Sequence, residues 1–175
     1  MRSRRKRDPL AQPEELIPHV YSYAAYRLGD GPDAEDVTSD VFERAIRYRK
    51  SYDPSKGEPI AWLLGIARRS VDAALNARPR DQAALEEVAG ETSIEDDSLR
   101  RLTLVAALRQ LSDRDQELIA LRYGAELTAV QIGEVLAMQT NAVEVALHRA
   151  LARLRGVLQA DEAETASQLS DVGGL

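Results

Sequence analysis

Apolar residues recur at helical spacing along most of this chain, and β-branched residues nowhere alternate with polar ones as they do in a strand. Pro13 and Pro59 stand where two helices are expected to begin, and Gly29 where the first should end. Asp33 is expected to cap the second helix, with Asp36 in the capping-box position. The pattern therefore predicts an all-α fold. The expected helices cover residues 13–28, 34–52, 59–78 and 99–111, with three more between 111 and 155.

The segment 111–155 has the pattern of a helix, a short helix and a longer helix joined by tight turns. Ser112 precedes an acidic run in the position of an N-cap, and Thr128 is expected to cap the short helix. The core-facing positions of the longer helix are Val143, Leu147, Leu151 and Leu154. This periodicity alone would also fit three ordinary helices of any all-α domain. The order of the elements favours a helix-turn-helix, whose second helix fits the major groove of DNA.

Charge is unevenly distributed along the 175 residues. The chain has 29 acidic and 23 basic residues, a net charge of −6 at pH 7, which taken alone argues against a nucleic-acid binder. Residues 81–97 hold seven acids and no base, and the stretch beyond Gln159 holds four acids and no base. Residues 99–159 carry eight Arg against six acids, so the helix-turn-helix segment is mildly basic.

The composition disfavours several classes of protein. There is no Cys, and the only His are His19 and His148, so we expect no disulfide, no metal site and no cofactor. No apolar run approaches the length of a membrane span, and the basic N-terminus lacks a following apolar segment, so we expect a cytoplasmic protein without membrane insertion. Without a His, Cys or Gly-rich phosphate loop near the acids, an enzyme is the least favoured class.

An acidic, polar stretch divides the chain. Residues 80–98 are too long for a structureless loop inside one compact domain, so we expect a flexible linker there. It should join two small helical domains, residues 10–79 and 99–158. A basic arm over residues 1–9 is expected to be unstructured, with phosphate contact as its alternative role, and the acidic residues 159–175 are expected to be a disordered tail.

Two features of the first half suggest binding surfaces. The helix expected over 34–52 gathers acids in its first turns and bases in its last, which either matches the helix dipole or presents an acidic surface to a basic partner. Trp62 and Arg69 share one side of their helix, next to a loop holding Tyr52 and Lys56. These four side chains could form a platform for single-stranded bases. Trp62 also fits a core position, which the bare sequence favours.

Three segments upstream of the helix-turn-helix carry distinctive motifs. Residues 33–42 read DAEDVTSDVF, residues 52–57 read YDPSKG and residues 61–68 read AWLLGIAR. In this order they resemble D-A-E-D-x-x-Q-E-x-F, F-D-P-x-x-G and A-W-L-x-x-I-A-R, the motifs of the extracytoplasmic-function (ECF) sigma factors, small bacterial initiation factors of RNA polymerase. The resemblance covers Pro13 to Leu158 and implies a region-two domain and a region-four domain.

The resemblance implies a set of partners. Region two would bind the clamp helices of the polymerase β′ subunit and capture unstacked bases of the minus-ten promoter element. Region four would bind the minus-thirty-five element and the flap of the β subunit. An anti-sigma factor would hold the protein inactive by wedging between the two domains.

The same resemblance assigns candidate residues to each surface. The candidates for binding core polymerase are Asp36, Ser39, Asp40, Phe42 and Glu43. The candidates for binding minus-ten DNA are Tyr52, Lys56, Trp62, Arg68, Arg69 and Asn76. The candidates for binding minus-thirty-five DNA are Thr128, Gln139, Thr140, Asn141, Glu144, Val145, His148 and Arg149.

The chain departs from the family pattern at several of these positions. Ser39 and Asp40 replace the usual Gln-Glu, which shortens both side chains. Ala137 replaces the glycine of the turn and is disfavoured there if its φ is positive. Glu144 and Ala146 replace a Lys and an Arg; Glu repels phosphate but can accept a hydrogen bond from the cytosine N4 amino group. Either the minus-thirty-five preference is unusual, or region four binds DNA weakly and relies on polymerase or another partner.

Two other functions stay open. A helix-turn-helix regulator with an unrelated sensor domain would bind duplex DNA without polymerase, but it leaves the three upstream motifs unexplained. A sigma-like decoy, whose recognition helix no longer reads DNA, has its best support in Glu144 and Ala146. The sequence favours an alternative sigma factor, which binds core RNA polymerase and promoter DNA and is not itself an enzyme.

Overall fold

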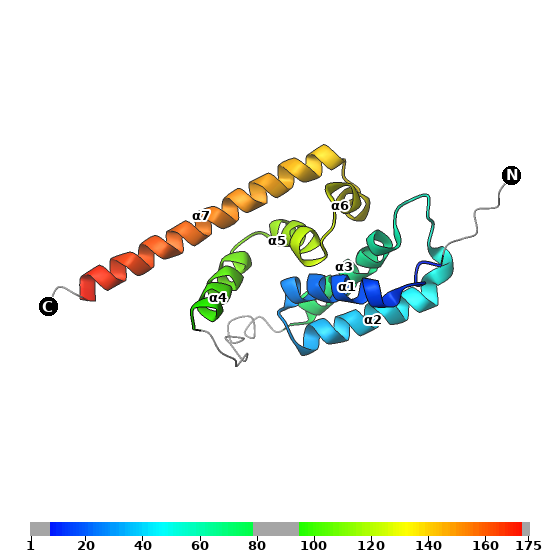
Figure 1. Ribbon diagram of the computed structural model, residues 1–175, viewed down its shortest axis with the longest axis horizontal. Coiled ribbons are helices and arrows are strands. Elements are labelled where there is room, and N and C mark those ends of the chain that lie inside the picture. The colour runs from blue at the N-terminus through cyan, green and yellow to red at the C-terminus, as the bar shows by residue number, and fades with distance from the viewer. Residues whose placement is uncertain (1–7, 79–94, 173–175) are drawn as a thin grey trace.

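The computed structural model describes residues 8–78 and 95–172, and within these ranges the chain is helical, with no strand (Figure 1). The predicted all-α class is therefore confirmed. The elements are α1 (Pro13–Leu28), α2 (Pro32–Tyr48), the short 3₁₀ turn η1 (Arg49–Ser51), α3 (Pro59–Ala77), α4 (Glu95–Arg109), α5 (Asp113–Ile119), the π-helical turn η3 (Ala120–Gly124), α6 (Ala129–Leu136) and α7 (Thr140–Val172).

Helices α1, α2 and α3 pack against one another as the N-terminal unit. Each begins with a proline in its first turn, where the missing N–H costs nothing because the first amides of a helix have no intrahelical partner. Gly29 follows α1 with a φ of 95°, so the glycine expected at its end is confirmed. The apolar positions spaced along the three helices, among them Val20, Val41 and Leu64, are fully buried.

The C-terminal unit is the predicted helix-turn-helix, built from α5, η3, α6 and α7. Ser112 caps α5 by accepting a hydrogen bond from the amide of Asp115. Thr128 caps α6 in a complete capping box with Gln131, so both predicted caps are confirmed. A three-residue turn separates α6 from α7, and Ala137 in that turn has φ 53° and ψ 46°, the left-handed conformation that favours glycine.

The two units share one apolar core. Turn η3 lies against α1, and α6 lies against α3. Leu118, Leu121 and Ile132 of the C-terminal unit belong to the same buried cluster as Tyr23 and Leu63 of the N-terminal unit. The described structure is therefore closed, with the helix-turn-helix seated on the three-helix unit.

Two helix starts differ from the sequence prediction. The capping box expected at Asp33 and Asp36 is wrong, because α2 begins two residues earlier than expected, at Pro32, after Gly31 and without a side-chain cap. Asp33 instead accepts a hydrogen bond from Arg78 at the end of α3. Helix α4 begins at Glu95, four residues before the expected 99.

The buried face of α4 also differs from the prediction. Their apolar character and spacing in the expected helix predict that Leu102 and Val105 are buried. They are 42% and 38% exposed, whereas Ala107 is fully buried. Leu108 packs beside Leu111 against α7. Within the described residues, α4 packs extensively against a single helix, α7. The buried face of α4 is therefore narrower than its apolar content suggests.

The C-terminal stretch expected to be disordered is largely helical, because α7 continues to Val172. Its sequence beyond Gln159 is rich in Ala and Glu, which are strong helix formers, so it can extend a helix that packing has already started. Residues 1–7 of the expected basic arm and residues 173–175 lie outside the described residues, as do residues 79–94, which include most of the linker expected over 80–98.

Candidate functional site

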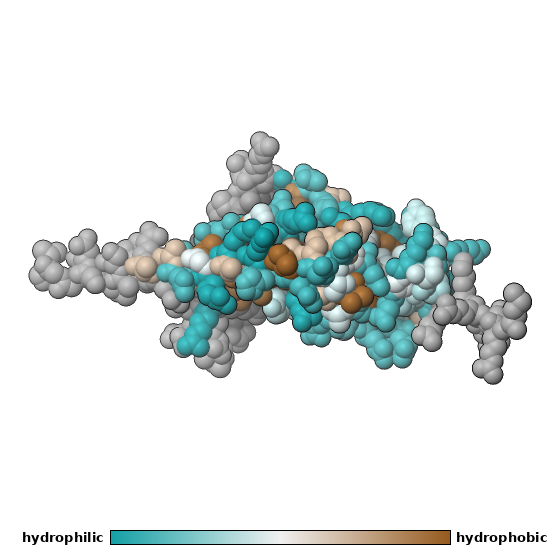
Figure 2. Space-filling view, turned by 90° about the horizontal axis from the view of Figure 1, so that it is seen from above, coloured by the Kyte–Doolittle hydropathy of each residue, from teal (hydrophilic) through white to brown (hydrophobic). Residues whose placement is uncertain are grey.

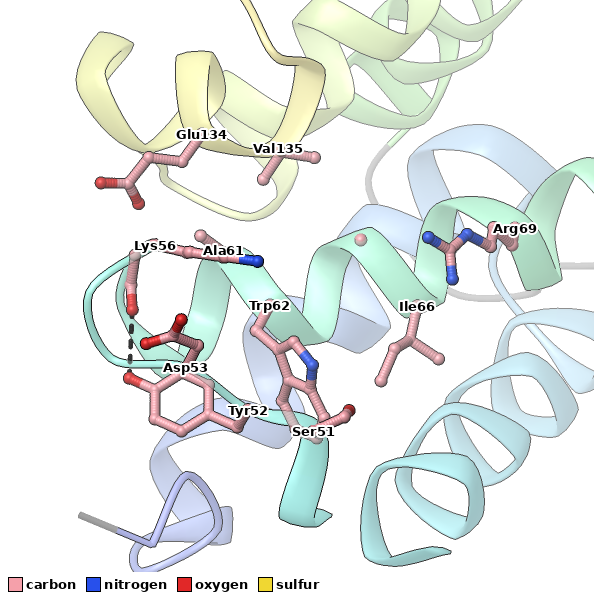
Figure 3. Close-up of a pocket in the computed structure, with 12 residues that line it drawn as sticks. Ser51, Tyr52, Asp53, Lys56, Ala61, Trp62, Ile66, Arg69, Glu134 and Val135 are labelled. Atoms are coloured by element: carbon pink, nitrogen blue, oxygen red, sulfur yellow. Dashed lines mark hydrogen bonds between the residues drawn. The ribbon is translucent and has the colours of Figure 1, made fainter. Parts of the chain in front are cut away.

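A pocket of about 370 Å³ opens at the start of α3, beside the loop that joins η1 to α3 (Figure 3). Tyr52, Lys56, Trp62 and Arg69, four of the six minus-ten candidates, line it together. Trp62 and Arg69 reach it from one face of α3, two turns apart, as their spacing predicted. The loop therefore brings an aromatic pair and two cationic side chains to one opening.

The two aromatic side chains of the pocket have different roles. Tyr52 is buried, and its hydroxyl donates a hydrogen bond to the carbonyl oxygen of Gly57 at 3.1 Å, which closes the loop on itself. The rings of Tyr52 and Trp62 are 5.6 Å apart with their planes tilted by 59°. Trp62 is only half-buried and lines the opening. Tyr52 thus supports Trp62, which is the accessible stacking surface.

The loop holds its shape through local bonds. The carboxylate of Asp53 accepts hydrogen bonds from the amide and the hydroxyl of Ser55, and the amide of Lys56 donates to the carbonyl of Asp53. Gly57 has a φ of 152°, which side-chain-bearing residues rarely adopt. The D-P-x-x-G sequence is therefore a structural turn that places Lys56 at the pocket.

Two minus-ten candidates lie elsewhere. Arg68 points to the other unit, where its Nε donates to Oε1 of Glu117 at 2.5 Å. Asn76 is exposed in the last turn of α3 and does not line the pocket. Sequence reasoning missed Ile66, which lies one turn beyond Trp62 and could have been found by its spacing. It also missed Glu134 and Val135, which reach the pocket from α6, about seventy residues away along the chain.

A second candidate surface runs along the outer face of α2. Asp36, Ser39 and Glu43 are exposed, and Asp40 and Phe42 are half-buried. Glu43 also bonds Arg47, one turn further along the helix.

Asp40 is tied into the fold more firmly than its neighbours on α2. Its carboxylate accepts hydrogen bonds from Arg44 and from Ser70 of α3. Partial burial raises the pKa of this carboxyl, but the hydrogen bonds from Arg44 and Ser70 outweigh that effect, so the pKa lies below its usual value. Asp40 therefore stays charged while joining α2 to α3.

Two large apolar side chains beside this face were not among the candidates. Ile46 is 64% exposed and Tyr48 is 55% exposed. Ile46 follows Ser39 and Glu43 at helical spacing, seven and three residues on, so the three share one side of α2. The sequence could have revealed Ile46 as a candidate contact residue, because it is a large apolar residue outside the buried stripe of α2, which ends at Ala45.

The minus-thirty-five candidates gather at the N-terminal end of α7. Val143 and Leu147 are buried as predicted, and the opposite positions Asn141, Glu144, Val145 and His148 are exposed. Gln139, Thr140 and Arg149 are exposed beside them. Thr128 stands apart from this strip, because its hydroxyl is engaged in the cap of α6.

Within residues 8–78 and 95–172, no three His, Asp or Glu side chains come together as metal ligands would. None of the helices in these ranges has the length and hydropathy needed to cross a membrane. Viewed from above, the surface is mainly hydrophilic, with small hydrophobic patches near its middle (Figure 2).

Comparison with family models gives two matches that follow each other along the chain. Residues 14–80 match the model described as Sigma-70 region 2, and residues 107–156 match the model described as Sigma-70, region 4.

Curated relatives give a consistent result. The chain is 32% identical over 152 residues to the ECF RNA polymerase sigma factor SigK of Mycobacterium ulcerans, a match covering 81% of this chain and 80% of SigK. It is also 32% identical over 150 residues to the ECF RNA polymerase sigma factor BldN of Streptomyces coelicolor. That match covers 81% of this chain but only 57% of BldN.

Solved structures share the fold. The sigma factor RpoE, crystallised with the anti-sigma factor NepR from Bartonella quintana, superposes with a TM-score of 0.66 at 20% identity, covering 85% of this chain and 94% of RpoE. CnrH, in complex with the cytosolic domain of CnrY, gives a TM-score of 0.58 at 23% identity, covering 85% of this chain and 83% of CnrH.

Proposed function

The chain belongs to the ECF RNA polymerase sigma factors, and we propose that its two helical units divide promoter recognition between the α3 pocket and the outer strip of α7. The three-helix unit lies in the region-two domain proposed over residues 10–79, and the helix-turn-helix lies in the region-four domain proposed over residues 99–158. As an alternative sigma factor, the protein binds core polymerase and directs it to promoters.

The pocket beside α3 is the observation that carries the proposal. Its Trp62 ring offers a face on which an unstacked base can lie, and Lys56 and Arg69 supply positive charge for the neighbouring phosphates. Stacking on an aromatic side chain contributes about 1–3 kcal/mol per base, whereas extruding a base from duplex DNA costs a few kcal/mol. One tryptophan thus holds an opened base but does not open the duplex alone, so core polymerase must supply further contacts.

The outer face of α2 is proposed as the surface that meets polymerase. Asp36 and Glu43 present negative charge to the clamp helices of the β′ subunit, and Ile46 adds an apolar contact beside them. Phe42 packs against the buried core and Asp40 accepts a hydrogen bond from Ser70 of α3, so both residues hold α2 in place. The acidic, partly apolar character of this face fits a basic helical partner better than it fits DNA, whose phosphates it would repel.

The exposed strip at the start of α7 is proposed to read the minus-thirty-five element. Asn141 can bond adenine, Glu144 can accept from the N4 amino group of cytosine, and Val145 can contact a thymine methyl group. The strip has few cations, so affinity for duplex DNA should depend on polymerase to hold region four in place. Contact of this unit with the flap of the β subunit is part of the proposal.

We extend the proposal to three further points. An anti-sigma factor that binds both units would regulate the protein. Because its partner is core polymerase, we propose that it acts in the cytoplasm. We also propose that it has no catalytic activity of its own, as an initiation factor.

Run-off transcription on fragmented genomic DNA of the source organism, with core polymerase and the full chain, tests the proposal. We expect discrete new transcripts with the native protein, loss of transcripts with Trp62→Ala, and unchanged transcripts with Tyr123→Ala, which removes an exposed aromatic ring outside the pocket. Binding of core polymerase without any transcript from the native protein would support the decoy reading. Duplex binding without any affinity for core would support the stand-alone regulator.

A further inference from the structure

The basic arm over residues 1–9 has no part in the function proposed so far. Its first seven residues hold five bases and no acid. We propose that the arm binds the phosphates of the DNA duplex that adjoins the opened minus-ten bases, as a site separate from the pocket and from the strip on α7. The place of this contact rests on the proposed function of the pocket, whereas its chemistry rests on the charge of the arm.

The root of the arm is fixed to the three-helix unit. Pro9 is buried, and Leu10 packs against the shared apolar core. Asp8 closes a tight turn, because its carboxylate accepts a hydrogen bond from the amide of Leu10 at 3.1 Å and its carbonyl oxygen accepts one from the amide of Ala11 at 3.3 Å. The structure therefore defines the point from which the arm leaves the folded unit.

This point lies near the rim of the minus-ten pocket. The carboxylate of Asp8 forms an ion pair with Arg49, the first residue of η1, at 3.6 Å. The carbonyl oxygen of Arg49 accepts a hydrogen bond from the amide of Tyr52, and both Ser51 and Tyr52 line the pocket. In Figure 1 the described chain begins beside the end of α2, close to the loop that joins η1 to α3.

The length of the arm sets how far it can reach. Seven residues span at most about 25 Å when fully extended, and base pairs follow one another about every 3.4 Å along a duplex. The bases of the arm can therefore meet phosphates up to about seven base pairs from its root. A duplex that continues from a base held in the pocket lies within that distance.

The described arginines around the root of the arm are already paired. Three of them, in the last turns of α2 and at the start of η1, each lie beside a carboxylate: Arg44 with Asp40, Arg47 with Glu43, and Arg49 with Asp8. These pairs leave little net charge for a phosphate backbone. The five bases of the arm are thus the concentrated positive charge at this end of the molecule.

The composition of the arm favours nucleic acid over a protein surface. Four of its five bases are Arg, whose planar guanidinium binds phosphate in a bidentate manner. Met1 is the only large apolar side chain before Pro9, so the arm lacks the apolar anchors that dominate the energy of protein interfaces. Its affinity must come from charge, and duplex DNA offers one negative charge about every 1.7 Å of its axis.

Anisotropy titrations of the full chain with a labelled duplex of random sequence, at several salt concentrations, test this chemistry. The neutral variant replaces the five bases by Gln, at Arg2, Arg4, Arg5, Lys6 and Arg7. It should bind the duplex at least about tenfold more weakly at low salt, and the loss of three phosphate contacts reduces the slope of log K against log salt by about 2.7. Replacing the four Arg by Lys keeps the charge and should preserve the slope.

A matched pair of variants separates the arm from the overall charge. Arg4→Gln with Arg5→Gln changes the arm. Arg100→Gln with Arg109→Gln changes exposed positions of α4 and alters the net charge equally. The arm variant should lose more affinity and more of the salt slope than its control. Equal losses would show that the net charge of the protein governs binding, and would overturn the inference.

The place of the contact is tested in the holoenzyme. The chain has no Cys, so Ser3→Cys accepts a single label, an iron chelate that cuts nearby DNA backbones. With core RNA polymerase and a promoter fragment found by run-off transcription, the cuts should fall within about seven base pairs of the minus-ten element. Ala106→Cys, at an exposed position of α4, is the labelled control and should not cut there.

The outcomes separate the arm from the pocket. Cuts that fall only at a distance from the minus-ten element would overturn the inference. If the neutral variant binds the duplex as well as the native protein but binds core polymerase more weakly, the arm meets an acidic protein surface and the inference fails. A native holoenzyme without transcripts would contradict the proposed function of the pocket, whereas the duplex titrations need no polymerase and still decide whether the arm binds DNA.

Discussion

The side chain of Arg68 in α3 donates to the carboxylate of Glu117 in α5 at 2.5 Å, which joins residues 49 positions apart. Glu117 is 11% exposed and Arg68 is 40% exposed, so water screens the pair from one side. Glu117→Gln should lower the free energy of unfolding by about 1–2 kcal/mol, since a charged hydrogen bond is weakened but not left without a partner. Urea unfolding of the full chain measures the loss.

A double-mutant cycle with Arg68→Gln tests whether this loss belongs to the pair. The two single losses should add to more than the loss in the double variant. Strict additivity would contradict a direct interaction between Arg68 and Glu117.

Ala137→Gly should stabilise the protein. Ala137 has φ 53°, and the left-handed conformation costs a residue with a Cβ about 1–2 kcal/mol. Glycine adds about 0.4–1 kcal/mol of freedom to the unfolded chain, so the net gain should be about 0.5–1 kcal/mol. The midpoint of thermal unfolding should rise. Ala142→Gly, in the first turns of α7, should lower it, and a fall with both variants would show that Ala137 is not strained.

The contribution of Asp40 should depend on pH. Its pKa is lowered in the folded state, so the stability it contributes is complete above the unfolded value of 3.8 and is lost as the pH falls through the folded pKa. Asp40→Asn should therefore be less stable than the native protein at pH 7, with a difference that shrinks towards pH 3. Urea midpoints of both proteins across this range measure the difference, with Asp36→Asn as an exposed control. A constant difference would mean that the charge of Asp40 is not involved.

Ile46→Ala should weaken binding to core polymerase without destabilising the chain. Ile46 is 64% exposed, so its truncation leaves no cavity, and the change removes the apolar contact while leaving the charge of the face unaltered. Affinity for labelled core polymerase is the measurement. Ile17→Ala, an equivalent change at an exposed position of α1, is the control. Equal losses in both variants would remove α2 as the docking face.

Glu144→Lys should strengthen binding to duplex DNA and steepen its salt dependence. Each added phosphate contact makes the slope of log K against log salt more negative by about 0.9. Anisotropy titrations with a labelled duplex at several salt concentrations give the slope. Glu14→Lys on α1 changes the net charge equally, so a similar gain there would show that the effect is general and not specific to the strip on α7.

The sequence predicts the helices well because each carries its own signals. Pro13, Ser112 and Thr128 mark helix starts through local chemistry, and the buried stripe of α7 follows from its spacing. The predicted cap at Asp33 is wrong because the sequence offers two possible starts for α2. The helix begins at the earlier one, Pro32, since proline is favoured in the first turn of a helix. The predicted burial of Leu102 is wrong because apolar spacing shows only which residues of a helix could be buried. How many of them are buried depends on how many helices pack against it.

The candidate site was predictable only in part, for a similar reason. Trp62 and Arg69 lie on one helix, so their spacing shows that they share a face. Glu134 reaches the same pocket from α6, and no pattern along the chain relates two helices that meet only through tertiary packing. The family resemblance assigned Arg68 to DNA, and no pattern along the chain indicates its partner Glu117, which lies 49 residues away.

The length of α7 determines how its two ends act on DNA. Asp161 follows Asn141 by twenty residues of continuous helix, which at 1.5 Å per residue places their backbones about 30 Å apart. At physiological salt the Debye length is about 8 Å, so a charge at that distance is screened almost completely. A phosphate at the exposed strip is therefore governed by Glu144, His148 and Arg149, and the overall net charge of −6 has little effect on binding there.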